Sequence, residues 1–178
     1  MPPLDALAAS HWTATAKETF RTHHLTTDLA VDVAIIGGGI LGTVTALHLA
    51  EAGVSVALVE AGRIGSGASG RNGGLVVPSL PRLSPDDAIA RLGSHGKGLV
   101  GMIARGADSV FALVERHAIA CDGVQAGWLN PSHGKSLVEG LKARCAAWAK
   151  AGAKVRFLEA DEARERIGSP HFHGAIFD

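Results

Sequence analysis

Cysteine is scarce in this sequence. Only Cys121 and Cys145 occur among its 178 residues, and two cysteines are too few for the disulfide scaffold of a secreted protein. Cys145 occupies an apolar position of an expected helix, so we interpret it as a small buried hydrophobic residue rather than a reactive thiol. This cysteine usage is typical of a reducing compartment, and we expect a cytoplasmic location.

Net charge of either sign is also absent. The chain has 17 Lys and Arg residues against 17 Asp and Glu residues, so it offers no general attraction to nucleic acid, whose binding usually needs a basic face. A hydrophobic share of 47% with 19% charged residues argues against a disordered chain.

Targeting and membrane segments are not apparent. Residues 1–5 lack a basic stretch that an apolar one follows, so no signal peptide is expected. The apolar run over residues 31–50 has the length of a membrane span, but it contains Asp32, His48 and four glycines. We therefore predict no membrane span.

Glycine, in contrast, is abundant and unevenly placed. Eleven of the 23 glycines lie between residues 37 and 74. No G-X-Y period accompanies them, which excludes collagen, and the interleaved Ile, Leu and Val residues argue against a flexible linker. Glycine clustered in an apolar segment usually marks backbone that passes close to another group.

The first glycines interrupt a pattern typical of a βαβ unit. Residues 30–36 form a β-branched run that predicts a strand buried on both faces, as in a parallel sheet. Residues 40–52 predict a buried helix that stops at Gly53, and residues 54–60 predict a second strand. Together they have the size of one crossover unit.

Other elements are predicted on both sides of this unit. Residues 1–29 are weakly patterned, and His11 and Trp12 within them are assigned only a surface or packing role. Beyond the unit we expect a helix interrupted by glycines over residues 81–117 and a strand over 124–130. A helix that Ser132 caps and Gly152 ends should follow, and then a strand over 154–158. The last expected elements are a short helix that Asp161 caps and Gly168 ends, with a Glu162–Arg166 pair on its surface, and a strand from residue 174.

The spacing of Gly37, Gly39 and Gly42 is that of a dinucleotide-binding fingerprint. The first glycine permits a tight turn, the second lets a pyrophosphate approach the backbone, and the third lets the helix pack on the strand. The free N–H groups near Ile40 and Leu41 would point at the phosphates, whose negative charge the helix dipole favours.

Glu60 ends the second predicted strand, 21 residues after Gly39. A carboxylate at this place accepts hydrogen bonds from ribose hydroxyls and would repel a 2′-phosphate, which favours FAD or NAD over NADP. The alternative is a structural βαβ unit with an incidental acid. The fingerprint by itself does not separate FAD from NAD.

The segment that follows is rich in Gly and Ser over residues 61–74. Its hydroxyls, guanidinium, carboxamide and N–H groups could wrap a second face of an extended anionic cofactor, or the segment could be a mobile surface loop. Residues 31–74 resemble the D-amino-acid oxidase-like (DAO) superfamily of FAD-dependent amine oxidoreductases, and within it the similarity is strongest to γ-glutamylputrescine oxidase-like enzymes. The resemblance is carried by VAIIGGGILG at residues 33–42, LVE at 58–60 and above all GASGRNGG at 67–74.

The resemblance implies an FAD site. Glu60 would contact the adenosine ribose, and the loop would line the path toward the isoalloxazine. Where some relatives carry a histidine that attaches flavin covalently, this chain has Arg71 and Asn72, so we expect non-covalent FAD. The predicted cofactor-binding residues are Gly37, Gly39, Ile40, Leu41, Gly42, Glu60, Ala61, Ala68, Ser69, Arg71, Asn72 and Gly73.

The resemblance also implies an α/β fold in which a Rossmann-type FAD-binding βαβ unit is followed by the start of an α+β substrate domain. We expect an N-terminal extension over residues 1–29, the N-terminal part of the FAD-binding domain over 30–118 and the start of the substrate-binding domain over 119–178. Two parallel strands are too few for a doubly wound sheet, so we hypothesise an incomplete fold, the N-terminal fragment of a longer chain.

The expected function is oxidation of the C–N bond of an amine or amino acid by hydride transfer to flavin N5. No catalytic residue and no metal ligand can be assigned from spacing. Two alternatives stay open: an NAD-dependent dehydrogenase, and a non-catalytic dinucleotide-binding fragment or subunit that needs a partner chain. The expected partner in the leading hypothesis is a small amine or amino acid.

Overall fold

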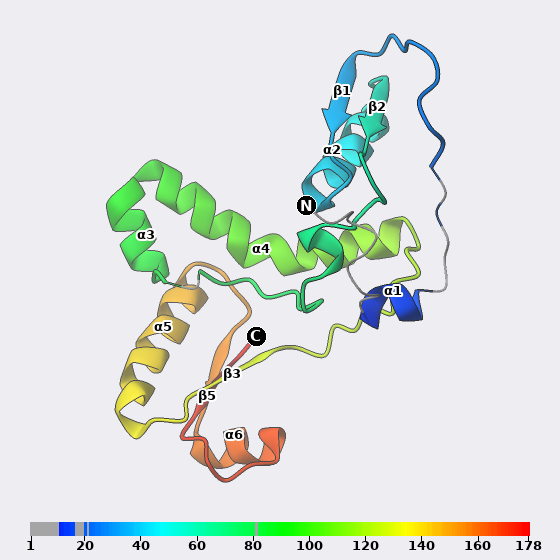
Figure 1. Cartoon of the computed structure of the whole chain (residues 1–178). Helices are drawn as coiled ribbons and strands as arrows, with labels where there is room; N and C mark the ends of the chain where they lie inside the picture. Colours follow the sequence, from blue (N-terminus) through cyan, green and yellow to red (C-terminus); the bar gives the residue numbers. More distant parts are fainter. Residues whose placement is uncertain (1–10, 17–19, 21, 81) are drawn as a thin grey trace. The chain divides into compact units, whose positions relative to one another are not determined.

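The structure of the chain, a computed structural model, describes residues 11–16, 20, 22–80 and 82–178 (Figure 1). Its contacts divide the chain into two compact units, of which the first ends at Leu75 and the second begins at Val76. The domain boundaries predicted after residues 29 and 118 stay predictions. The first unit contains α1 (His11–Thr15), β1 (Val33–Ile36), α2 (Ile40–Glu51), β2 (Val56–Val59) and the 3-10 turn η2 (Ala68–Gly70).

The second unit combines helices with a small sheet. Its helices and 3-10 turn are α3 (Pro85–Leu92), α4 (Ser94–Arg116), η3 (Lys135–Leu137), α5 (Val138–Lys150) and α6 (Ala160–Ile167). Its strands are β3 (Leu129–Pro131), β4 (Arg156–Leu158) and β5 (Ala175–Phe177). The order of a βαβ unit followed by an α+β unit confirms the predicted fold class.

The first unit is built on one parallel strand pair. β1 and β2 pair in register from Val33 with Val56 to Ile36 with Val59, and α2 connects them and contacts both (Figure 1). Asp32 supports the start of the pair, because its Oδ2 accepts from the N–H of Ser55 at 3.1 Å. The predicted strand–helix–strand unit is therefore present.

The predicted burial of this unit was wrong. Strand β1 alternates in exposure, and Ile36 at its end is 90% exposed rather than buried. Helix α2 has no buried residue, and Leu41 is 84% exposed. The reason is that a parallel sheet buries both faces only when neighbouring strands and helices cover it, and in the described residues β1 pairs with β2 alone.

The second unit carries the apolar core. Its antiparallel sheet has the order β3-β5-β4, with α5 packed on β4 and β5 and α6 on β4. Ala88, Val100 and Trp148 form one buried cluster that joins α3, α4 and α5. Gly96 permits the close packing of α4 on α3, because a Cβ there would lie 2.8 Å from the Cα of Ile89.

A second buried cluster holds α6 on the sheet. It consists of Leu158, Ala163 and Ala175, with Leu129 and Ile167 packed against it. Cys145 of α5 is buried as well, which confirms its interpretation as a core residue, and burial raises the pKa of its thiol.

Two predicted helix caps were wrong. The hydroxyl of Ser132 donates to the carbonyl of Gly134 at 2.9 Å, and α5 begins six residues later, after η3. Asp161 lies in the first turn of α6, whose N-cap position is Glu159. The predicted strand over residues 124–130 is also displaced, since β3 comprises Leu129–Pro131.

No helix in the described ranges of the chain has both the length and the apolar character that crossing a membrane requires.

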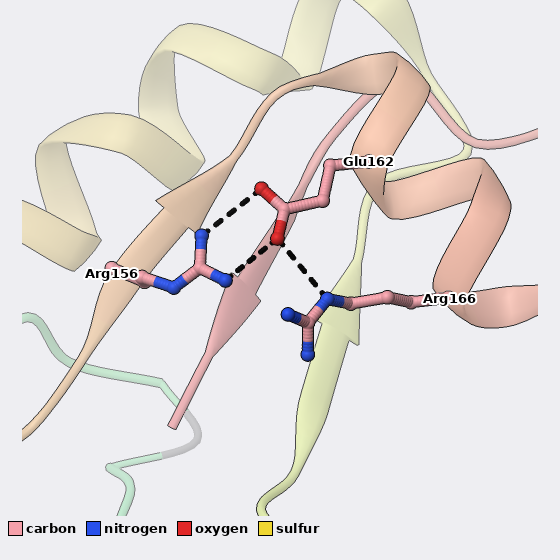
Figure 2. Close-up of polar contacts among 3 residues, drawn as sticks. All are labelled: Arg156, Glu162 and Arg166. Carbon is pink, nitrogen blue, oxygen red and sulfur yellow. Dashed lines mark hydrogen bonds and ion pairs between the residues drawn. The ribbon is translucent and has the colours of Figure 1, made fainter.

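Glu162 connects α6 to the sheet through charged hydrogen bonds (Figure 2). Its carboxylate accepts from two nitrogens of Arg156 at 3.0 and 2.6 Å and from Nε of Arg166 at 3.1 Å. Both guanidinium groups lie over the ring of Phe177, at 5.6 Å for Arg156 and 4.9 Å for Arg166. The predicted Glu162–Arg166 pair is thus confirmed. Arg156 of β4 bonds to the same carboxylate and so links the pair to the sheet.

We expect Glu162→Gln to lower the free energy of unfolding at neutral pH. The hydrogen bonds from Arg156 hold the pKa of Glu162 below its ordinary value of 4.5. A carboxyl with a lowered pKa contributes stability above its unfolded value, and this contribution is lost as the pH falls through the folded value. Denaturant unfolding at pH 7 and at a series of acidic pH values should therefore show a difference between wild type and variant that shrinks below about pH 4.5.

Glu165→Gln provides the matched control, because Glu165 is exposed on the same helix and forms no ion pair with any residue that the structure describes. It should unfold like the wild type at every pH. Equal destabilisation by the two substitutions would show that the cluster around Glu162 adds nothing specific.

Candidate functional site

The turn between β1 and α2 brings the three fingerprint glycines together. Gly37 has a φ of +105°, which a residue with a side chain rarely adopts, and its N–H donates to the carbonyl of Val59 at 2.8 Å. A Cβ on Gly42 would collide with the carbonyl oxygen of Gly37 and lie 3.3 Å from Cγ2 of Ile35. Both positions therefore let the first turn of α2 lie against the end of β1.

The N-terminus of α2 leaves backbone donors available. The N-cap residue Gly39 has no side chain to cap the helix, and its carbonyl accepts the first helical bond from Thr43 at 2.9 Å. The N–H of Ile40 donates to the hydroxyl of Ser69 at 2.9 Å. For the N–H groups of Leu41 and Gly42 the described residues supply no acceptor, so these two donors can receive an anion.

Glu60 connects this turn to the chain that follows β2. Its Oε2 accepts from the N–H of Gly38 at 2.7 Å and its Oε1 from the N–H of Gly62 at 2.9 Å. Backbone hydrogen bonds hold the pKa of Glu60 below its ordinary range. The bond from Gly38 has the largest effect, the bond from Gly62 the next and a bond from Ala61 a smaller one. The carboxylate stays ionised, and each oxygen retains a lone pair that a hydroxyl could use.

The glycine-rich loop folds back on the turn. The N–H of Gly65 donates to the carbonyl of Gly38 at 2.9 Å, which joins the loop to the turn by a second route. A Cβ on Gly39 would lie 3.0 Å from Oγ of Ser69, so glycine at this position favours the close approach of the loop to the helix start. A Cβ on Gly70 would meet the carbonyl of Gly65.

The last part of the loop is ordered by its own polar groups. The side chain of Asn72 donates to the carbonyl of Ser69 at 2.7 Å and accepts from the N–H of Gly74 at 2.8 Å. Nε of Arg71 donates to the carbonyl of Gly67 at 3.2 Å. Composition had left open that residues 61–74 are a mobile surface loop. In the structure the last part of this segment is a hydrogen-bonded turn.

Most predicted site residues lie at this one place in the first unit. Gly37, Gly39, Ile40 and Gly42 form the turn and helix start, and the hydroxyl of Ser69 accepts a hydrogen bond from Ile40 there. Arg71, Asn72 and Gly73 are exposed in the same loop, as are Ala61 and Ala68. Cofactor contacts for all twelve residues stay a prediction.

Two residues that sequence reasoning passed over, Gly38 and Trp12, take part in the arrangement. Gly38 is buried and joins Glu60 to Gly65, and its place between two fingerprint glycines could have drawn attention to it. Trp12 of α1 donates from its indole nitrogen to the carbonyl of Asn72. Nothing in the spacing of residues 1–29 indicates that contact.

Among the residues that the structure describes, no three His, Cys, Asp or Glu side chains gather as ligands of a metal ion would.

Comparison with known proteins gives a consistent result. The chain matches the DAO family, described as FAD dependent oxidoreductase, over residues 32–178. It is 34% identical over 175 residues to the gamma-glutamylputrescine oxidoreductase of Escherichia coli (strain K12), covering 96% of this chain and 40% of that protein. It is 28% identical over 149 residues to the glycine oxidase of Geobacillus kaustophilus (strain HTA426), covering 82% of this chain and 38% of that protein.

Solved structures agree with this similarity. The glycine oxidase from Bacillus cereus ATCC 14579 superposes with a TM-score of 0.57 at 28% identity, covering 83% of this chain and 38% of that chain. The L-proline dehydrogenase from P. horikoshii superposes with a TM-score of 0.63 at 23% identity, covering 82% of this chain and 35% of that chain. This second likeness concerns the fold alone. The chain thus spans about 40% of the length of the relatives that it matches.

We expect Gly42→Ala to destabilise the first unit by about 1–3 kcal/mol, the usual cost of forcing a methyl group into packed surroundings. The added methyl would have to displace the carbonyl of Gly37, which separates α2 from β1. Amide hydrogen exchange of β1 and β2 measures the effect.

Gly67→Ala is the control within the same unit, since a Cβ on Gly67 would meet nothing within 4 Å and its φ of −75° suits alanine. It should change stability by less than about 0.5 kcal/mol. Similar exchange rates in the two variants would contradict the close contact at Gly42.

Proposed function

The chain belongs to the DAO family of FAD dependent oxidoreductases, and from this premise we propose that its first unit binds FAD along the β1–α2 turn and the loop after β2. We further propose that the protein containing these units oxidises the C–N bond of an amine or amino acid. In this proposal residues 30–118 serve FAD binding, and residues 119–178 belong to the substrate-binding part.

The observation that carries the proposal is the pair of available backbone N–H groups at the N-terminus of α2. The N–H groups of Leu41 and Gly42 are not taken by the described residues, and they lie at the positive end of the α2 dipole. Gly39 beside them leaves the backbone uncovered. A diphosphate supplies the negative charge and the several acceptor oxygens that such a group of donors favours.

Two polar side chains fit the rest of a dinucleotide. Ser69 accepts from Ile40 with its oxygen, so its own hydroxyl proton is available for a phosphate oxygen. Glu60 is held ionised at the end of β2 by backbone N–H groups, and its remaining lone pairs suit the ribose hydroxyls. A carboxylate at this place would repel a 2′-phosphate, which supports FAD rather than a 2′-phosphorylated cofactor.

The loop supplies the next group of proposed contacts. Ala68 before Ser69 and Arg71, Asn72 and Gly73 after it are exposed, so we assign them to the side of the cofactor that leads toward its ring. Arg71 and Asn72 stand where some relatives carry a histidine that attaches flavin covalently, so the proposed attachment is non-covalent.

The names of the relatives support the reaction class. Gamma-glutamylputrescine oxidoreductase and glycine oxidase are named for an amine and an amino acid, which share a carbon bonded to an amino nitrogen. FAD, when bound, supplies the acceptor for a hydride equivalent from that carbon. The chain's own part, in this proposal, is to hold the diphosphate and ribose so that the ring is oriented toward a substrate.

FAD binding tests the proposal directly. Titration of the wild-type chain with FAD, followed by quenching of flavin fluorescence and by retention of flavin absorbance after gel filtration, should show binding. Gly39→Val should abolish it, because the β-branched side chain would occupy the space between the helix start and Ser69, where a Cβ alone lies 3.0 Å from Oγ.

Gly67→Ala again serves as control and should bind FAD like the wild type, since a side chain at Gly67 has free space. Hydrogen exchange of the β1–β2 amides identifies any loss of binding that is caused by unfolding. Unchanged FAD affinity in a folded Gly39→Val variant would refute the proposed location of the diphosphate.

A further inference from the structure

We propose that Trp12 is a positioning residue for the FAD site: it holds the glycine-rich loop and, through that loop, the start of α2. The role toward FAD rests on the proposed function. The contacts of Trp12 with the loop can be tested without FAD. The match to the family model begins at residue 32, so that match assigns Trp12 no role.

Trp12 makes two different contacts with the end of the loop. Its indole N–H donates to the carbonyl of Asn72 at 2.8 Å, and its ring lies against Gly74. A Cβ on Gly74 would lie 3.0 and 3.1 Å from Cζ2 and Cη2 of the ring, and the φ of Gly74 is +69°. A glycine is therefore required at this position both for its backbone conformation and for the approach of the indole.

A continuous series of hydrogen bonds leads from this contact to the proposed phosphate site. Trp12 donates to the backbone of Asn72, and the Asn72 side chain donates to the carbonyl of Ser69 at 2.7 Å. The Ser69 hydroxyl in turn accepts from the N–H of Ile40 at 2.9 Å. Three residues thus connect α1 to the first N–H of α2.

The loop has a physical need for such an anchor. Four of the eight residues 67–74 are glycine, and glycine loses more conformational freedom on ordering than any other residue. The first unit holds none of the buried apolar side chains that the structure describes, so no core fixes the loop from beneath. Trp12 is 47% exposed, and its ring lies against Gly74.

The primary test compares Trp12→Phe with the wild type. Phenylalanine keeps an aromatic ring at this position but has no N–H to donate to Asn72. We expect the amide of Ile40 to exchange about two- to tenfold faster, the factor that corresponds to loss of one hydrogen bond, and FAD to dissociate more readily by a similar factor. The amide of Gly37, which bonds to Val59, should keep its exchange rate and report an intact strand pair.

Thr15→Ala is the matched control on the same helix, because among the described residues the Thr15 hydroxyl bonds to the carbonyl of His11 within α1 alone. It should leave both Ile40 exchange and FAD affinity unchanged. A second measurement uses Gly74→Ala, whose added methyl would meet the indole. Its effect on Ile40 exchange should be smaller in a Trp12→Ala background than in the wild type.

The outcomes separate this inference from the proposed function. Faster Ile40 exchange in Trp12→Phe with weaker FAD binding supports both. Ile40 exchange that is unchanged in Trp12→Phe and Trp12→Ala overturns the positioning role, even if the wild type binds FAD. A wild type that binds no FAD refutes the proposed function, while the exchange data still decide whether Trp12 orders the helix start.

Discussion

The hydrogen bond from the N–H of Gly38 to the carboxylate of Glu60 holds the β1–α2 turn to the end of β2. The carbonyl of Gly38 meanwhile accepts from Gly65, so one buried peptide joins the turn, the second strand and the loop. A side chain at Gly38 would collide with Ile64. With this peptide fixed, the first turn of α2 presents its backbone donors at a defined place, on which the proposed diphosphate site depends.

The two units differ in what they expose and what they bury. The first exposes backbone, since a cofactor with phosphates is held by N–H groups and a helix dipole rather than by apolar side chains. Its apolar residues, Ile36 and Leu41 among them, stay largely exposed. The second unit buries Val100, Trp148 and Leu158 between its helices and sheet, and the hydrogen bonds of Glu162 link α6 to β4.

Local pattern was sufficient to predict most elements. The β-branched run before Gly37 and the apolar run after it mark β1 and α2 within a few residues, because strand and helix periodicity are properties of neighbouring residues. Burial was mispredicted for both, since exposure depends on what other segments cover. The caps expected at Ser132 and Asp161 failed for a related reason: each side chain can serve several nearby backbone groups, and packing of the following helix selects among them.

The sequence by itself determined the family, the fold class and the three fingerprint glycines, because these follow from motifs whose spacing is local. Only the tertiary structure decided how those positions are used. Glu60 meets Gly38 across 22 residues, Ser69 meets Ile40 across 29, and Trp12 meets Asn72 across 60. Such contacts depend on the path of the intervening chain, which no local periodicity specifies. They bring a carboxylate to the β1–α2 turn, a hydroxyl to the start of α2 and an indole to the glycine-rich loop.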